Sequence, residues 1–154
     1  MFTSEGEVQA WIAEALKAQA TGTEVAFAIV RRSDGVAVGS TRYLDIRHPH
    51  LSLEIGWTWL AREAQRTAIN TEAKLLQLTH AFESHGAVRV QLKTDERNEQ
   101  SRAAISRLGA VFEGILRNYQ TRPHDAYVRN TAMYSITATE WPAIKARLKA
   151  RLAR

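Results

Sequence analysis

The stretch 65–74, QRTAINTEAK, joins an alternating apolar run to a leucine-rich helical run. The first N–H groups of a helix have no intrahelical acceptors, and the helix dipole adds partial positive charge there. A strand that leads into such a helix start can therefore bind an anion such as a phosphate. Arg66 adds a cation, and the small Ala68 allows close approach of the backbone. The alternative is an ordinary loop in which Asn70 or Thr71 caps the helix.

A second candidate region is the run LSLEIGWTWL at 51–60. Its alternation predicts a strand with one apolar and one more polar face. Glu54 lies on the polar face, where it is either a general base or a partner in an ordinary ion pair. The apolar face, expected to pack in the core, comprises Leu51, Leu53, Ile55, Trp57 and Trp59; the polar face comprises Glu54, Gly56 and Thr58.

The segment 98–109 predicts a short helix with polar groups at its start. Asn98 either caps this helix or binds a ligand, and Ser101 is either a packing residue or a proton donor. Tyr119 and Tyr134 are expected to line a cleft or the core. Since His48 and His50 have too few companions for a metal centre, we expect no metal.

The composition of the chain is that of one globular domain spanning 1–154. The chain has 45% hydrophobic and 24% charged residues and no cysteine, which excludes disulfides, thiolate metal ligands and a cysteine nucleophile. It has no run long enough for a membrane span and no signal-like N-terminus, so we expect a cytoplasmic protein with no membrane partner.

The formal net charge is +5, and much of the excess lies in the tail KARLKARLAR. A solvated basic face on a terminal helix accounts for this charge. No basic stripe with interleaved aromatic residues supports nucleic-acid binding, so we expect no nucleic-acid partner.

The predicted order of elements is α-β-β-β-α-β-α-β-β-α, a mixed sheet covered by helices. Ser4 and Glu7 form a capping box before the first helix, and Asp34-Gly35 joins strands at 25–32 and 36–46. The strand at 51–60, the helix reaching Glu83 and the strand at 88–94 predict a parallel crossover with ligand space at the strand ends. A turn at 122–125 separates the last two strands, and a helix starting near 139 buries Trp141, Ile144 and Leu148.

Several motifs in this order resemble the RimJ/RimL-like branch of the GNAT N-acetyltransferase superfamily, over about two-thirds of the chain. They are Glu54-Ile55-Gly56-Trp57, the loop 65–70, Thr71-Glu72-Ala73, Asn98 with Ser101, Leu108-Gly109, and Glu113-Gly114 with Arg117. The resemblance implies an α+β fold with helices on both faces of a mostly antiparallel sheet and one splayed parallel strand pair.

The resemblance also implies acetyl-CoA as cosubstrate and an amine as acceptor. The cofactor-binding residues that it implies are Arg66, Thr67, Ala68, Ile69, Asn70 and Thr71 for the pyrophosphate, Trp57, Thr58 and Trp59 for the pantetheine, and Asn98 with Ser101. Glu54 would take the amine proton through water, and Ser101 or Tyr134 would protonate the leaving thiolate.

The chain departs from this family at three points. The loop glycines are Ala68 and Asn70 here, which suits a loop that already has right-handed geometry. The family's first strand and helix are missing before Met1, so either an edge strand is absent or a partner covers it, which makes a homodimer plausible. A family carboxylate falls on Gln120, which cannot act as a base and weakens an analogy with ribosomal-protein substrates.

The segments 45–52 and 121–128 are expected to wall the acceptor pocket. They carry Arg47, His48, His50, Arg122, His124 and Asp125. Such walls do not suit a polycation, and a protein N-terminus, an amino acid or a small amine stays open as acceptor. The competing hypothesis is a non-catalytic acyl-CoA-binding or sensor module on the same fold.

Overall fold

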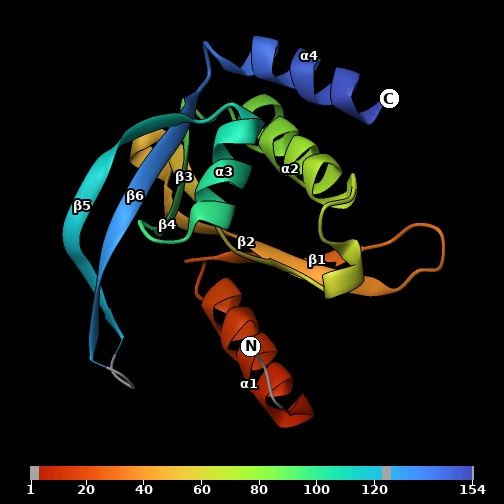
Figure 1. Cartoon of the computed structure of the whole chain (residues 1–154), viewed down its shortest axis with the longest axis vertical. Coiled ribbons are helices and arrows are strands. Elements are labelled where there is room, and N and C mark those ends of the chain that lie inside the picture. The colour runs from red at the N-terminus through yellow and green to blue at the C-terminus, as the bar shows by residue number, and fades with distance from the viewer. Residues whose placement is uncertain (1–3, 123–125, 154) are drawn as a thin grey trace.

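The computed structural model describes residues 4–122 and 126–153 (Figure 1). The order of helices and strands is the predicted one. The elements are α1 (Glu5–Ala20), β1 (Val25–Val30), β2 (Ala37–Arg47), β3 (Ser52–Leu60), α2 (Ile69–Thr79), β4 (Arg89–Asp95), α3 (Glu99–Leu108), β5 (Val111–Arg122), β6 (Tyr127–Thr137) and α4 (Trp141–Leu152).

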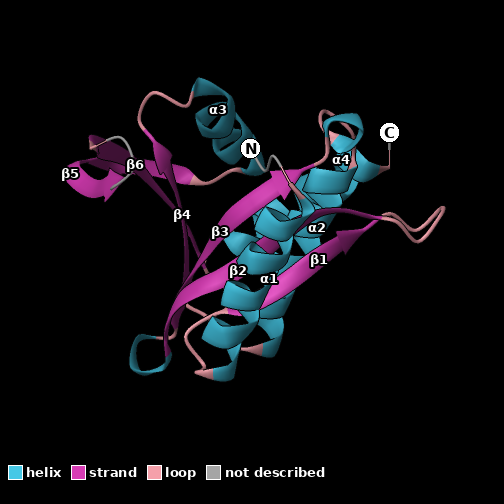
Figure 2. Cartoon of the chain, turned by 90° about the horizontal axis from the view of Figure 1, so that it is seen from below, coloured by secondary structure: helices cyan, strands magenta, loops and turns pink. Residues whose placement is uncertain are grey.

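The six strands form one sheet in the order β1-β2-β3-β4-β6-β5. All neighbouring pairs are antiparallel except β3 and β4, which confirms the mixed sheet. The parallel pair is matched only from Ser52–Arg89 to Glu54–Gln91. Beyond these residues β3 and β4 diverge, as Figure 2 shows.

Helices cover both faces of the sheet, with α1 on one side and α2, α3 and α4 on the other (Figure 1). The side chains of β2 reflect this division. Thr41 and Tyr43 bond to Gln77 of α2, whereas Arg42 donates to the carbonyl of Trp11 in α1. The α2 side holds the main core, in which the three α4 residues predicted to be buried lie together with Leu78, Val90, Leu92 and Ile136. No helix in the described ranges is long and apolar enough to cross a membrane.

Two of the sequence signals at helix ends, Ser4 and Gly109, are confirmed. Ser4 caps α1 and accepts a hydrogen bond from the N–H of Glu7. α3 ends at Gly109, whose φ of 101° would strain any other residue. The helix predicted to reach Glu83 keeps its α-helical form to Thr79 and continues as one π-helical turn over His80–Ser84.

The strand at 51–60 contains a β-bulge that the alternation of its residues conceals. The register against β2 jumps from Arg42–Gly56 to Ser40–Trp59, so β3 carries one extra residue. Trp57 has a φ of 48° at this point. The prediction that Trp57 and Trp59 pack in the core is therefore wrong: they are 60% and 39% exposed, because the bulge reverses the alternation after Gly56.

Candidate functional site

The loop before α2 presents unpaired backbone donors at the positive end of a helix. The N–H groups of Arg66, Thr67 and Ala68 have no acceptor among the residues that the structure describes. Ala68 is the N-cap of α2 and provides no side-chain cap, so the alternative prediction that Asn70 or Thr71 caps this helix is wrong. Only the N–H of Ile69 is engaged, by Thr67 Oγ1 at 3.3 Å. The loop therefore keeps the donors that an anion requires.

The two positions where the family has glycine tolerate their side chains. Ala68 has φ −66° and ψ −20°, and Asn70 lies within α2, so both are right-handed as expected. The positive φ in this loop belongs to Arg66, at 61°. Ala68 and Asn70 are therefore compatible with the geometry of the loop. The unfavourable backbone conformation, with positive φ, is that of Arg66.

Asn70 also supplies an observation that points to a ligand. Its Oδ1 atom is buried and has no hydrogen-bond partner within the described residues. An orphaned buried acceptor is costly, and one in the first turn of α2 lies close to the unpaired N–H groups. A ligand with both phosphates and amide N–H groups, such as coenzyme A, fits this combination of donors and acceptor.

The splay of β3 from β4 leaves a stretch of backbone without a strand partner on the β4 side. Ladder pairing with β4 ends at Glu54, and Trp57, Thr58 and Trp59 are all exposed. Gly56 leaves little room for a side chain, because a Cβ atom would lie 2.6 Å from Leu44 Cδ1 and 3.1 Å from Glu54 Oε1 and would push these side chains aside. A bulge beside a strand gap is a common setting for an active site.

Glu54 is buried at the point where the strands part, on the α1 face of the sheet. Its Oε2 atom lies 2.8 Å from Lys93 Nζ and accepts a hydrogen bond from Gln91 Nε2 at 3.2 Å. The side chain of Glu54 is only 2% exposed. The carboxylate is thus both an ion-pair partner, as one of the two interpretations expected, and a candidate base beside the gap.

The start of α3 combines a helix cap with a free amide group. Asn98 Oδ1 accepts a hydrogen bond from the N–H of Ser101 at 2.9 Å, so Asn98 caps the helix. The amide NH₂ of Asn98 has no protein partner in the described part of the chain, and the residue is exposed. Capping through Oδ1 therefore leaves the amide NH₂ of Asn98 available for a ligand. Ser101 is half-buried in the first turn.

Tyr134 lies near the start of α3 but on the opposite face from Glu54. Its hydroxyl accepts a hydrogen bond from Arg102 Nε at 3.2 Å, and the residue is 2% exposed. Because Tyr134 is opposite the core residue Leu92, it belongs to the α2 face of the sheet. The structure thus brings Tyr134 close to the first turn of α3 and separates it from Glu54 by the thickness of the sheet.

The predicted walls of the acceptor pocket are partly described. Arg47 pairs with Asp45 at 2.7 Å, and His48 and His50 lie in an exposed 3₁₀ turn. Tyr119 of β5 is exposed, and Lys93 Nζ lies 5.1 Å from the centre of its ring. Of the predicted wall residues, His124 and Asp125 fall outside the described residues.

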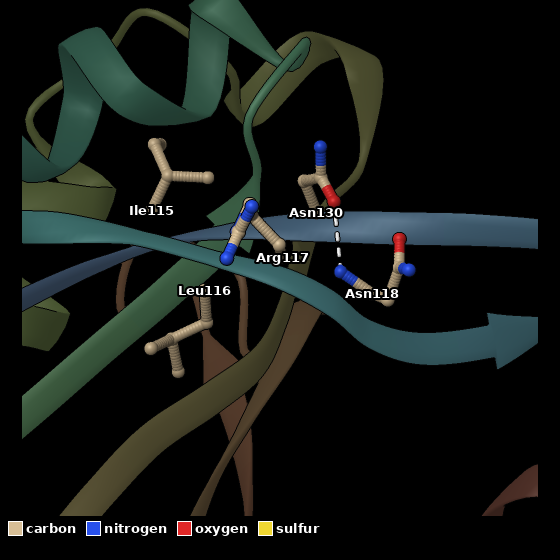
Figure 3. Close-up of a pocket in the computed structure, with 5 residues that line it drawn as sticks. All are labelled: Ile115, Leu116, Arg117, Asn118 and Asn130. Atoms are coloured by element: carbon tan, nitrogen blue, oxygen red, sulfur yellow. Dashed lines mark hydrogen bonds between the residues drawn. The ribbon is translucent and has the colours of Figure 1, made fainter.

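A second irregularity shapes the β5–β6 hairpin. The register between these strands shifts between Leu116 and Gln120, and Asn118 has a φ of 51°. Its N–H donates to Asn130 Oδ1 at 2.8 Å, and both residues line a hollow of about 690 Å³ (Figure 3). Asn130 Nδ2 in turn donates to Glu96 Oε1 at 2.8 Å, which ties the hairpin to the turn before α3.

Two lysines of the site were not predicted, Lys93 and Lys74. Lys74 of α2 is 3% exposed and bonds to Thr41, Thr58 and Gln77. A signal was present in the sequence, because Lys74 precedes the fully buried Leu78 by four residues and so lies on the same helix stripe. No comparable signal links Lys93 to Glu54.

Comparisons with known proteins agree with this geometry. Residues 2–111 match the acetyltransferase (GNAT) domain family. The chain is 32% identical over 114 residues to the Bacillus subtilis (strain 168) protein named "Putative ribosomal N-acetyltransferase YdaF", a match that covers 73% of this chain and 60% of that protein. The chain thus spans less than two-thirds of the length of this relative.

Two solved structures have the same fold. A GCN5-related N-acetyltransferase from Brucella melitensis has a TM-score of 0.89 at 28% identity, covering 96% of this chain and 65% of its own. A T. thermophilus protein described as a "putative acetyltransferase" has a TM-score of 0.77 at 41% identity, covering 90% of this chain and 74% of its own. The splayed parallel pair, the uncapped start of α2 and the family match agree, and the chain belongs to the GNAT acetyltransferase family.

Proposed function

We propose that this chain transfers an acetyl group from acetyl-CoA to an amine. The observation that carries the proposal is that the chain combines unpaired N–H groups at Arg66, Thr67 and Ala68 with a β3 segment that has no ladder pairing to β4 after Glu54. The first suits a diphosphate, and the second can pair with an extended amide chain. Coenzyme A contains both groups in one molecule.

Acetyl transfer requires an uncharged amine, a polarised thioester carbonyl and a proton for the departing thiolate. Glu54 takes the amine proton through a water molecule on the α1 face. A backbone N–H of the bulged segment Trp57–Trp59 stabilises the developing oxyanion. Ser101 or Tyr134 supplies the proton on the α2 face, since both lie near the start of α3.

The proposed base and the proposed proton donor lie on opposite faces of the sheet. Glu54 points to the α1 side, whereas Tyr134 belongs to the α2 side. Ladder pairing between β3 and β4 ends at Glu54, and we place the acyl group where these strands part. An acyl group held in that gap would meet the amine from one side and the proton donor from the other. Alignment of the two substrates then supplies much of the rate enhancement.

For the acceptor we propose a protein N-terminus, an amino acid or a small amine. The name of the B. subtilis relative refers to ribosomal N-acetylation. Gln120 occupies the position of a family carboxylate, and it lies exposed on β5. Because of the relative's name, we would test ribosomal protein N-termini first as acceptors. The loss of the family carboxylate at Gln120 means that other amines must be tested beside them.

Two measurements test the proposal. Calorimetry with coenzyme A should give saturable 1:1 binding, and mass spectrometry of peptide and small-amine pools incubated with acetyl-CoA should find an acetylated product. A chain that binds coenzyme A but acetylates no amine would be the non-catalytic binding module, which the ion pair of Glu54 with Lys93 favours as the second candidate. Absence of coenzyme A binding would exclude both.

A further inference from the structure

Lys74 is buried between α2 and the sheet, where its ammonium group has three partners. Nζ donates to Thr41 Oγ1 at 2.8 Å, to Thr58 Oγ1 at 2.7 Å and to Gln77 Oε1 at 2.9 Å. The three N–H bonds of the ammonium group are thus matched by three acceptors. All three acceptors are neutral, and no carboxylate pairs with Lys74 among residues 4–122 and 126–153.

This arrangement is costly for the folded chain. Burying an ammonium group without a counter-charge is unfavourable even when its hydrogen bonds are made. Accordingly, burial lowers the pKa of Lys74 to about 7. An apolar side chain of similar length would fill the same space without that cost, so the contribution of Lys74 must come from the groups that it holds in place.

The most informative of these groups is Thr58, which lies within the β3 bulge. Lys74 Nζ and Thr41 Oγ1, at 2.7 and 2.8 Å from the Thr58 hydroxyl, fix this residue to α2 and to β2. Thr41 is itself 1% exposed and so is a rigid anchor. The sequence predicted Thr58 on the polar face with Glu54. Since the bulge reverses the alternation, Thr58 instead points to α2.

The same lysine is close to the start of α2. It follows Ile69 by five residues, which is roughly 7.5 Å along a helix axis. One side chain thus connects the helix whose N-terminal N–H groups suit a diphosphate to the strand segment whose backbone suits a pantetheine chain. A ligand of fixed covalent length that uses both regions requires a fixed distance between them.

We propose that Lys74 is a positioning residue that fixes the bulge of β3 relative to the N-terminus of α2, so that both regions bind one coenzyme A molecule. This inference rests on the proposed function. Loss of Lys74 should displace the strand segment and leave the N–H groups of Arg66, Thr67 and Ala68 in place, because Lys74 bonds to Thr41, Thr58 and Gln77 and not to that loop.

The protonation of Lys74 alters this network. A neutral amine has two donors and one acceptor, so one of the three bonds must reverse and a threonine hydroxyl must donate to Nζ. Of the titratable groups, Tyr43 of β2 joins this network through its hydrogen bond to the Gln77 carbonyl, and His80, just after α2, stacks on Tyr43. Arg42 and Glu54 bond to partners on the opposite face of the sheet. Burial raises the pKa of Tyr43 to about 12, so its titration is well separated from that of Lys74.

The test compares a whole ligand with half of it. In Lys74→Met, the affinity for coenzyme A should fall about tenfold, or about 1.4 kcal/mol. The affinity for adenosine 3′,5′-bisphosphate, which lacks the pantetheine, should stay within about twofold of wild type. Lys17→Met, an exposed lysine of α1, is the matched control and should leave both affinities unchanged.

A spectroscopic readout needs no ligand. Trp57 and Trp59 flank Thr58, so the tryptophan emission of the free wild-type chain should change with a midpoint near pH 7, and Lys74→Met should lack this transition. If Lys74→Met does not fold, Thr58→Val removes one acceptor and should weaken coenzyme A binding selectively. Equal affinities of wild type and variant for coenzyme A would overturn the role of Lys74. Failure of the wild type to bind coenzyme A would instead overturn the proposed function.

Discussion

Lys93 of β4 and Glu54 of β3 form a 2.8 Å ion pair at the place where these parallel strands stop pairing. The pair spans the beginning of the gap and holds the carboxylate on the α1 face. Burial disfavours the charged form of Lys93, but the hydrogen bond and charge of Glu54 outweigh it, so the pKa of Lys93 is raised. The lysine therefore stays charged at neutral pH and lies beside the candidate base.

Replacing Lys93 should slow catalysis by releasing Glu54. In Lys93→Met, the Glu54 carboxylate loses its 2.8 Å ion-pair partner and keeps the hydrogen bond from Gln91, so it is held less firmly at the end of the β3–β4 pairing. Steady-state kinetics should therefore show a lower kcat with little change in coenzyme A affinity. Lys93→Arg keeps the charge and should keep most of the activity. Wild-type kcat in Lys93→Met would mean that Lys93 does not position Glu54.

Glu54→Gln tests the base directly. Because general-base catalysis typically contributes a factor of about 100 or more, kcat should fall by at least that amount. The affinity for coenzyme A should change little, since the unpaired donors of the α2 loop are untouched. Glu113→Gln is the matched control, because Glu113 is also an ion-paired strand carboxylate, bound to Arg89. Full activity of Glu54→Gln across the pH range would assign the base elsewhere.

Asn98 permits its two roles to be separated. Asn98→Asp keeps the side-chain oxygen that caps α3 but loses the amide NH₂, so stability should be preserved and coenzyme A affinity should fall. Asn98→Ala loses both, and should also lower the free energy of unfolding by about 1 kcal/mol. Denaturant titration and calorimetry on the two variants measure these effects. Wild-type affinity in Asn98→Asp would limit Asn98 to capping.

The sequence predicted the order of elements because their signals are local. Ser4 with Glu7, the apolar stripe of α4, and Gly109 after α3 each depend on neighbours within one or two turns. The bulge at Trp57 was not predictable, because the run from Leu51 to Trp59 alternates without a break. Its position is set by pairing with Ser40 and Arg42 of β2, which the alternation within β3 does not reveal.

The parts of the candidate site that depend on local sequence were predicted, and the parts that depend on long-range contacts were not. The unpaired loop before α2 and the cap at Asn98 follow from local patterns and the resemblance. The contacts of Lys74 with Thr58, of Lys93 with Glu54 and of Tyr134 with Arg102 join residues more than 15 positions apart in the chain, so they depend on how the strands and helices pack. Lysine in a helix is normally exposed, which explains why Lys74 was overlooked.

A negative charge at the start of α2 should have opposite effects on stability and on ligand binding. In Ala68→Asp, the carboxylate interacts favourably with the helix dipole and should raise the free energy of unfolding of the free chain by about 0.5 kcal/mol. The same carboxylate repels a diphosphate, so coenzyme A affinity should fall. Ala68→Asn is the neutral control and should keep most of the affinity. Undiminished binding by Ala68→Asp would place the diphosphate elsewhere.

The buried Lys74 should also make stability depend on pH in a defined direction. Its pKa is 10.5 as an ordinary lysine and about 7 in the fold, because burial disfavours the charge. Between these values the unfolded chain binds a proton that the folded chain does not, so protonation favours unfolding. The free energy of unfolding should therefore fall as the pH decreases from 10.5 to 7, by at most about 1.4 kcal/mol per pH unit, and this contribution should level off below pH 7.

Other groups titrate in the same range, so the measurement must be a difference between variants. Urea unfolding of wild type and Lys74→Met at several pH values isolates the contribution of Lys74. The stability gained by the variant should be largest at pH 7 and should shrink towards pH 10.5. Lys17→Met should follow wild type throughout. A constant difference between wild type and Lys74→Met would mean that Lys74 keeps its ordinary proton affinity and that Thr41, Thr58 and Gln77 offset the burial of its charge.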